Sequence, residues 1–199
     1  MEASGRMNAD LAAPLISDST WWYLSRASGF VSLTLFTASV ARGLMTAGRV
    51  AGPSWPRFVI EGLHRNLSLA AVVFVSVHAL MLLADEFVQI GLLDVFVPLV
   101  SGYLPLWLGL GALAFDVLLA LVISSMLRVR VRHRVWRTVH WMAYLGWPVA
   151  LAHMIGIGTD RVWVLTAVSL SLLVVLSCGT LRLAGWRRVA MSRPVEVAP

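Results

Sequence analysis

The stretch HRNLSLAAVVFVSVH, residues 64–78, begins and ends with histidine and holds one charged residue, Arg65, between them. It is apolar enough to lie inside a bilayer, where an imidazole is costly unless a partner or ligand satisfies it. A second stretch, HWMAYLGWPVALAH at residues 140–153, repeats the arrangement with His140 and His153. The two stretches therefore predict buried segments whose histidines have a specific partner.

The composition predicts an all-α integral membrane protein. Of the 199 residues, 59% are hydrophobic and only 13% are charged, and the mean hydropathy of +0.81 lies outside the range of soluble domains. The single cysteine, Cys178, lies in an apolar run, which excludes a disulfide framework and a cysteine-ligated metal site. We therefore expect the bilayer to dictate the fold.

Five apolar segments are each near the ~20 residues that a membrane-spanning helix needs. We expect them at about residues 21–45, 58–84, 104–127, 135–157 and 162–184. The apolar segment 86–105 is broken by Asp94, Pro98 and Pro105. It is expected to form an interfacial loop or a short surface helix, with a re-entrant segment as the alternative.

The arginines predict the orientation of this five-helix bundle. All sixteen basic residues are arginine, the net charge is +6, and twelve arginines fall on one side, in the loops after the first and third segments and in the tail. The positive-inside rule then places the N-terminus outside and the C-terminus in the cytoplasm. Arginines that flank spans indicate contact with anionic lipid and not with nucleic acid.

This orientation divides the chain into three parts. Residues 1–20 are expected to form an extracytoplasmic N-terminal segment, residues 21–184 the transmembrane domain, and residues 185–199 a cytoplasmic tail. The first twenty residues are mixed and polar, without the apolar region of a signal peptide.

The second and fourth segments run in the same direction, so their histidines occur at matching depths. His64 and His140 are expected near the inner leaflet, and His78 and His153 near the outer one. On a regular helix His64 and His78 lie about 21 Å apart and nearly on one face. The separation of thirteen positions between His140 and His153 leaves their side chains about 140° apart around a regular helix. We expect Pro148 to distort the helix so that both histidines face the same side.

Two imidazoles at each of two depths suit a planar haem that is ligated on both axial sides and carries single electrons. The structural alternative is that the histidines form hydrogen bonds between helices. Zinc is disfavoured, because neither depth offers a carboxylate or thiolate to complete a tetrahedral site. Four histidines at two depths favour the haem.

These segments are similar to those of the ferric reductase-like transmembrane domain superfamily. The similarity rests on LHRNLSLAAVVFVSVHALMLLAD (63–85), ISSMLR (123–128) and VWRTVHWMAYLGWPVALAHMIGIGTD (135–160), with WWYLSRASGFVSLTLFTASVARGL (21–44) resembling the opening helix of bacterial members. The resemblance covers about residues 20–185. It implies two stacked b-type haems, with iron ligated by His64 and His140 near the inner face and by His78 and His153 near the outer face.

The resemblance further implies a multi-pass protein of the bacterial cytoplasmic membrane that passes electrons across it, as the component of an oxidoreductase. Many relatives have six spans where this chain has five, and the cytosolic FAD and NADPH domain of the oxidases is missing. No Gly-rich dinucleotide motif follows the last span, so a separate flavoprotein or quinol is expected to donate or accept the electrons.

Four further residues are candidates for supporting roles. Arg26 and Arg65 could pair with haem propionates, although both could instead extend to the interface. Asp116 lies in the middle of a span, where an ionisable group could relay a proton or accept a hydrogen bond from a ligand, or be a neutral acid bonded to a neighbouring helix. His133 lies in the arginine-rich loop and is expected to be a solvated residue, although a flavin phosphate or a redox partner could dock there.

Two alternative functions remain open from the sequence. One is a single-haem subunit with FMN or quinone at the other depth. The other is a membrane subunit without redox chemistry, such as a transporter or assembly factor, whose histidines serve packing.

Overall fold

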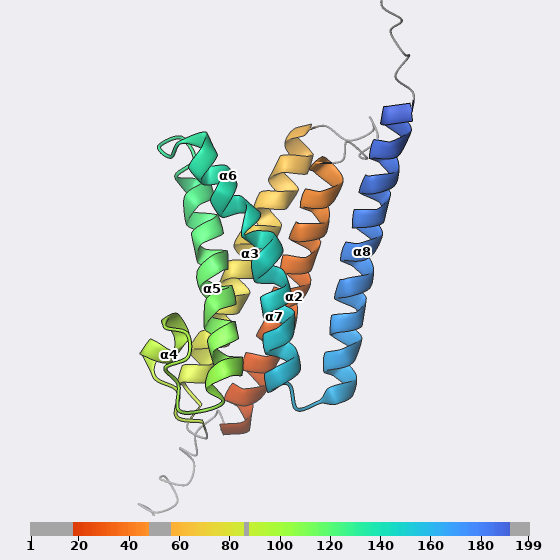
Figure 1. The fold of residues 1–199 in the computed structure, drawn as a ribbon. Coiled ribbons are helices and arrows are strands. Elements are labelled where there is room, and N and C mark those ends of the chain that lie inside the picture. Colours follow the sequence, from red (N-terminus) through yellow and green to blue (C-terminus); the bar gives the residue numbers. More distant parts are fainter. Residues whose placement is uncertain (1–17, 48–56, 86–87, 192–199) are drawn as a thin grey trace, which may run out of the picture.

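The computed structural model describes residues 18–47, 57–85 and 88–191, and all of the regular structure in them is helical. In chain order the helices are α2 (Asp18–Ala47), α3 (Arg57–Leu83), α4 (Leu92–Phe96), α5 (Pro105–Met126), α6 (His133–Trp141), α7 (Ala143–Ile157) and α8 (Arg161–Met191). Figure 1 shows the long helices side by side in one bundle, with α8 at one edge and α5 at the other. The all-α prediction is confirmed.

Four helices in the described part are long and apolar enough to cross a membrane, at Thr20–Met45, Glu61–Leu83, Pro105–Met126 and Arg161–Gly185. They coincide with four of the five expected spans. Large apolar side chains cover their outer surfaces; Leu173 and Leu176 of α8, for example, are 62% and 63% exposed. Such extensive apolar surface suits a lipid environment and not water.

The expected fourth span is two helices instead of one. α6 ends at Trp141 and α7 begins at Ala143, with Met142 in a turn between them. The two helices follow one another from one end of the bundle to the other (Figure 1). The expected distortion near Pro148 is therefore wrong in position: Pro148 lies inside α7, and the interruption occurs six residues earlier.

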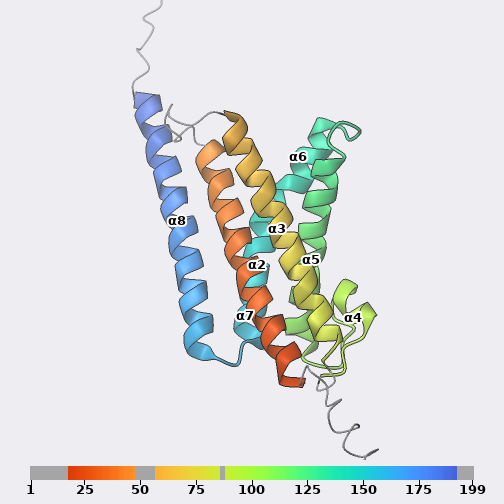
Figure 2. The same cartoon turned by 180° about the vertical axis from the view of Figure 1, so that it is seen from behind.

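The segment between α3 and α5 contains the short helix α4, in agreement with the expected short helix. Asp94 caps it, because the backbone N–H of Gly91 donates to Oδ2 of Asp94 over 2.8 Å. The segment packs against the start of α5 (Figure 2), where the backbone of Leu99 approaches Gly109 so closely that no Cβ would fit.

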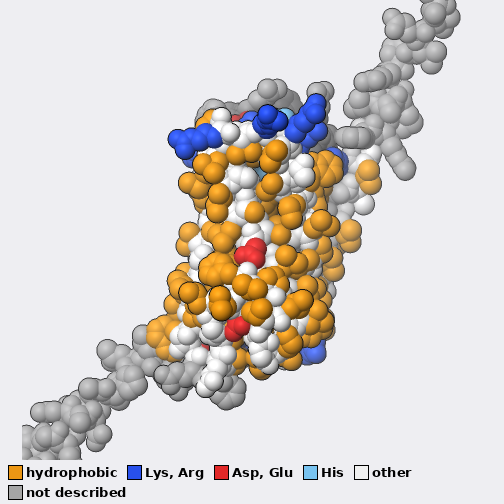
Figure 3. All heavy atoms as spheres, turned by 60° about the vertical axis from the view of Figure 1, so that its left-hand side comes forward, with side chains coloured by type: hydrophobic (Ala, Val, Ile, Leu, Met, Phe, Trp, Pro, Cys, Tyr) orange, Lys and Arg blue, Asp and Glu red, His pale blue; other side chains and the backbone are white. Residues whose placement is uncertain are grey.

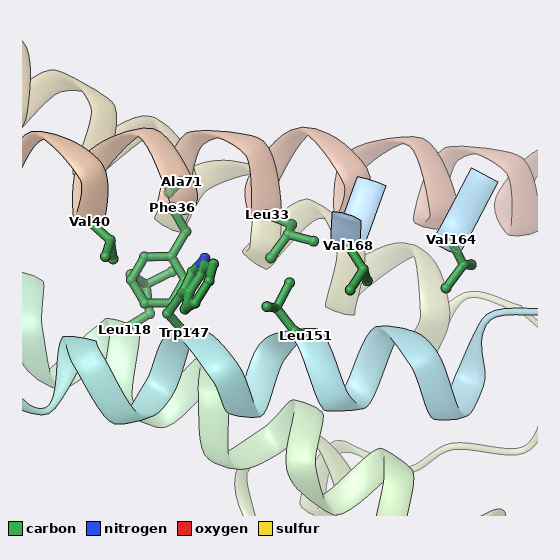
Figure 4. Packing of buried hydrophobic residues seen from close by; sticks show 9 residues of the cluster. All are labelled: Leu33, Phe36, Val40, Ala71, Leu118, Trp147, Leu151, Val164 and Val168. Carbon is green, nitrogen blue, oxygen red and sulfur yellow. The ribbon is translucent and has the colours of Figure 1, made fainter. Parts of the chain in front are cut away.

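A compact apolar layer fills the middle of the bundle. It contains Leu33, Phe36, Val40, Ala71, Leu118, Trp147, Leu151, Val164 and Val168. Figure 4 shows Phe36 of α2 and Trp147 of α7 pointing toward one another between their helices. The indole N–H of Trp147 donates to Oγ1 of Thr37 over 3.0 Å, which satisfies the polar atom of this buried side chain.

Positive charge gathers at one end of the bundle (Figure 3). This arginine-rich end holds the last turns of α2 and α5, the first turns of α3 and α6, and the C-terminal part of α8. Of the arginines that predicted the orientation, Arg6, Arg49 and Arg193 lie outside the described residues, as do residues 1–17 of the expected N-terminal segment and residues 192–199 of the expected tail.

Candidate functional site

The four histidines of the two stretches form two pairs. His64 and His140 lie near the arginine-rich end, with their ring centroids 6.0 Å apart and their planes at 68°. His78 and His153 lie toward the opposite end, with centroids 6.3 Å apart and planes at 85°. We call these the first pair and the second pair. In each pair one ring comes from α3 and the other from α6 or α7.

The spacing within each pair fits a metal centre between the rings. A metal bound at about 2 Å from one nitrogen of each of two facing imidazoles separates the ring centres by about 6 Å. In the described part of the chain, no group of three or more His, Cys, Asp or Glu side chains could hold a metal ion. Two imidazoles therefore suit a metal whose remaining ligands come from a macrocycle.

Backbone carbonyls orient both rings of the second pair. The Nδ1–H of His78 donates to the carbonyl oxygen of Ser25 over 2.7 Å, and the Nδ1–H of His153 donates to that of Trp107 over 2.8 Å. A carbonyl accepts and never donates, so the proton is fixed on Nδ1 and Nε2 is left free to ligate a metal. Partners of this kind also increase the basicity of a metal-bound imidazole.

Two glycines make room for the second pair. A Cβ at Gly29 of α2 would lie 2.9 Å from Nδ1 of His78, and a Cβ at Gly111 of α5 would lie 2.5 Å from Cε1 and Nδ1 of His153. Any larger residue at these positions would displace the rings. The glycines thus allow α2 and α5 to approach the two histidines.

A cavity of about 260 Å³ borders the second pair. Its walls include both rings of this pair, both glycines, and apolar side chains of α2, α5 and α7 such as Phe36, Leu118 and Met154. An apolar cavity with two imidazoles aimed across it has the character of a cofactor pocket.

The first pair is held differently. Nδ1 of His64 lies 3.2 Å from Oγ of Ser39, within hydrogen-bond distance. Nδ1 of His140 is buried and has no hydrogen-bond partner among the described residues. Trp136 instead stacks on the His140 ring, with centroids 5.0 Å apart and planes at 23°. An indole face therefore orients His140 where a carbonyl orients its counterpart.

Helices α2 and α3 pack in an antiparallel seven-residue register that places a serine at each histidine of α3. Ser25 contacts His78 and Ser39 contacts His64, and midway between them Ser32 donates to the carbonyl oxygen of Ala71 over 3.0 Å. Ala71 is fully buried, because small residues let membrane helices approach closely. These serines were not among the predicted site residues, although their seven-residue spacing on the first span was a usable signal.

The two candidate propionate partners occupy different settings. Arg26 borders the cavity and its guanidinium already bonds Oδ2 of Asp160 and Oγ1 of Thr159, each over 2.7 Å. Arg65 follows His64 and is exposed. The role expected for each stays a prediction.

The two remaining candidates lie apart from one another. Asp116 is partly exposed in the middle of α5 and is not among the hydrogen-bond partners of the four paired rings, and its role as a proton relay or ligand support stays a prediction. His133 lies at the arginine-rich end and stacks on Trp136, with centroids 5.5 Å apart.

The chain belongs to the ferric reductase-like transmembrane family: the family described as "Ferric reductase like transmembrane component" matches residues 27–151, more than half of the chain. The matched range contains the first pair and His78, and it ends two residues before His153. No curated protein and no solved structure matches the chain. Membership identifies the chain as a membrane component of the redox, electron-transfer class.

Proposed function

We propose that the protein is a haem b electron-transfer subunit. His64 and His140 would ligate one haem iron, and His78 and His153 a second. The proposal is carried by one observation: both pairs have ring separations, 6.0 and 6.3 Å, that suit a six-coordinate haem iron. When bound, the haem would supply one-electron redox chemistry, while the protein supplies ligation, burial and orientation.

We further propose that α6 and α7 together make a fifth crossing. They hold 9 and 15 residues, enough at about 1.5 Å per residue to cover about 30 Å of hydrocarbon. Residues 21–184 then form one haem-binding transmembrane domain in contact with lipid, with residues 1–20 outside and residues 185–199 in the cytoplasm. The arginine-rich end faces the cytoplasm of a bacterial cell, and the first pair lies on that side.

Separate proteins or quinones would complete the electron path, since a ferric reductase-like membrane component implies redox partners. A cytoplasmic flavoprotein or a membrane quinol would exchange electrons at one face, and a further acceptor at the other. The protein is then one component of an oxidoreductase and needs its partners for turnover.

Haem stoichiometry tests the proposal directly. A pyridine haemochrome assay on protein purified after expression with ample haem is expected to give about two b-type haems per chain, because each pair can hold one iron axially. A value near one would favour the single-haem subunit with FMN or quinone at the other depth. Colourless protein would remove the redox proposal and leave a membrane subunit without redox chemistry.

Reporter fusions test the orientation. A reporter fused after Pro199 is expected to be active in the cytoplasm, and one fused at Asp94, between α3 and α5, outside it, because the arginine-rich end should face inward. The opposite pattern would exchange the inner and outer assignments of the two pairs.

A further inference from the structure

A continuous stack of aromatic rings runs along α6 from the surface to the first pair. His133, Trp136 and His140 stand at i, i+3 and i+7 on one helix face. Trp136 stacks on His133 with centroids 5.5 Å apart and on His140 with centroids 5.0 Å apart. The centroid of His64 lies 6.0 Å beyond His140. His133 is exposed, whereas Trp136 and both rings of the first pair are partly buried, so the stack joins the surface to the first pair.

The surface around this stack carries a dense positive charge. The arginine corner, residues 128–137 between the end of α5 and the first turns of α6, holds Arg128, Arg130, Arg132, Arg134 and Arg137. The sequence contains no acidic residue between Asp116 and Asp160, so no carboxylate of that segment offsets this charge. Arg128 lies over the Trp136 ring, 5.0 Å from its centroid, so one of these positive charges is in direct contact with the aromatic stack.

The positive-inside rule accounts for arginines at this end of the bundle, but it does not account for aromatic rings aligned between them and His140, whose Nδ1 is buried without a partner among the described residues. Transient redox complexes have small interfaces that form through complementary charge. Such a complex needs positive charge beside a group that leads to the redox centre. The arginine corner places positive charge beside Trp136, whose ring stacks on the proposed ligand His140.

We propose that the arginine corner is the docking surface for a soluble electron-carrier protein with an acidic rim around its redox centre, and that His133, Trp136 and His140 form the path between that centre and the first pair. This inference rests on the proposed haem ligation. In the step itself, the carrier's reduced flavin would give up one electron, and the haem iron that His64 and His140 would hold would take up that electron. The rings of Trp136 and His133 are chemically unchanged.

The experiment uses the full chain in nanodiscs of neutral phosphatidylcholine, so that the lipid contributes no net charge, and reduced flavodoxin, a small acidic flavoprotein, as the probe. Binding is measured on haem-free protein by surface plasmon resonance at several salt concentrations. The limiting first-order rate of haem reduction at saturating flavodoxin is measured on haem-loaded protein by stopped flow. The binding measurement tests the docking surface, and the limiting rate of haem reduction tests the path through the aromatic rings.

The arginines are expected to govern association only. Replacing Arg130 and Arg132 together by glutamine should slow association about tenfold at low salt and weaken its salt dependence, with the limiting rate retained. Arg182→Gln removes a charge from the same end of the bundle but on α8, at the opposite edge, and should change association little. Equal effects of the two sets of variants would overturn the docking surface.

The rings are expected to govern the limiting rate only. Trp136→Leu should lower it several-fold, Trp136→Phe should largely retain it, and flavodoxin affinity should not change. The control is Trp163→Leu, since Trp163 lies on α8 and is 68% exposed. Because Trp136 also contacts a proposed ligand, His133→Leu provides a second variant that breaks the stack farther from the iron and should give a smaller loss. Unchanged limiting rates in both variants would overturn the path.

Anionic lipid is the competing occupant of the arginines. If nanodiscs that contain phosphatidylglycerol abolish flavodoxin binding at every salt concentration, the arginines serve lipid headgroups and the docking surface is wrong. The binding readout does not need haem. Failure of the proposed haem ligation would therefore appear as colourless protein, whereas failure of the docking surface would appear as absent or salt-independent binding.

Discussion

The two histidine pairs have nearly the same ring separation, 6.0 and 6.3 Å, but very different support. Both rings of the second pair donate to backbone carbonyls, over 2.7 and 2.8 Å, and each faces a glycine that no other residue could replace without a clash. In the first pair a serine hydroxyl at 3.2 Å supports His64, and a tryptophan face supports His140.

The second pair therefore has rigid support, and the first pair has adjustable support. A backbone carbonyl inside a helix cannot move without disturbing the helix, so the second pair is preorganised. A serine side chain and a stacked indole can adjust, and the indole also connects the first pair to the exposed His133. We infer that the second pair is built to hold its cofactor in a fixed geometry, and the first pair to exchange electrons with a partner.

The largest expected effect comes from removing a ligand. His64→Ala and His140→Ala should each remove the same haem, because each deletes one axial bond to the same iron, and the double variant should lose little more, as expected for residues that share one interaction. His78→Ala and His153→Ala should remove the other haem. Low-temperature α-band spectra and haem content of the variants measure this.

One variant from each pair provides the control for this pairing. His64→Ala combined with His78→Ala should remove both haems. If His64→Ala and His140→Ala removed spectrally different haems, the parallel pairing of α3 with α6 and α7 would be wrong.

The next largest effect is expected at Gly111. In Gly111→Ala the new Cβ would lie 2.5 Å from two atoms of the His153 ring, so the ring must turn away from the Trp107 carbonyl. Overpacking of this kind costs about 1–3 kcal/mol. The haem of the second pair should be lost or bound only weakly, with the first haem retained in the α-band spectrum.

Gly62→Ala is the matched control for Gly111→Ala. A Cβ at Gly62 of α3 meets nothing within 4 Å, although the position is two residues from His64, so both haems should be retained. Equal haem loss in the two variants would show that the packing around the second pair does not select for glycine.

The long apolar helices were predictable because a membrane span can be identified by its length and apolar composition. The boundaries of α3 and α5 fall within a few residues of the expected ones. The histidine pairs were predictable because nearly equal spacings, 14 and 13 positions, on two parallel segments bring the side chains to similar depths. Both predictions depend only on the helical rise and on the cost of burying polar groups.

The support around the histidines was not predictable in the same way. The carbonyl of Trp107 is a backbone group, so no residue type marks it. Serine and threonine in a membrane helix often donate a hydrogen bond to the preceding turn of the same helix, as Ser28 does to the carbonyl oxygen of Leu24. From sequence, these residues cannot be distinguished from the serines that bond a neighbouring helix. The break between α6 and α7 occurs at Met142, where no glycine or proline marks it in the sequence. We expected the distortion at Pro148 because proline is the usual sequence signal for a kink.

The smallest expected effect distinguishes side-chain support from backbone support. Ser39→Ala removes the hydroxyl beside Nδ1 of His64, whereas Ser25→Ala leaves the carbonyl oxygen that accepts from His78 in place. Loss of such a partner typically weakens a metal site about 10–100-fold. Ser39→Ala should therefore weaken haem binding at the first pair within this range, as measured by haem titration of haem-free protein. Ser25→Ala should leave the second pair close to unchanged, and Ser39→Thr, which keeps a hydroxyl, should restore most of the affinity. A larger loss from Ser25→Ala than from Ser39→Ala would mean that the hydroxyls, and not the carbonyls, hold the second pair, and the contrast between rigid and adjustable support would be wrong.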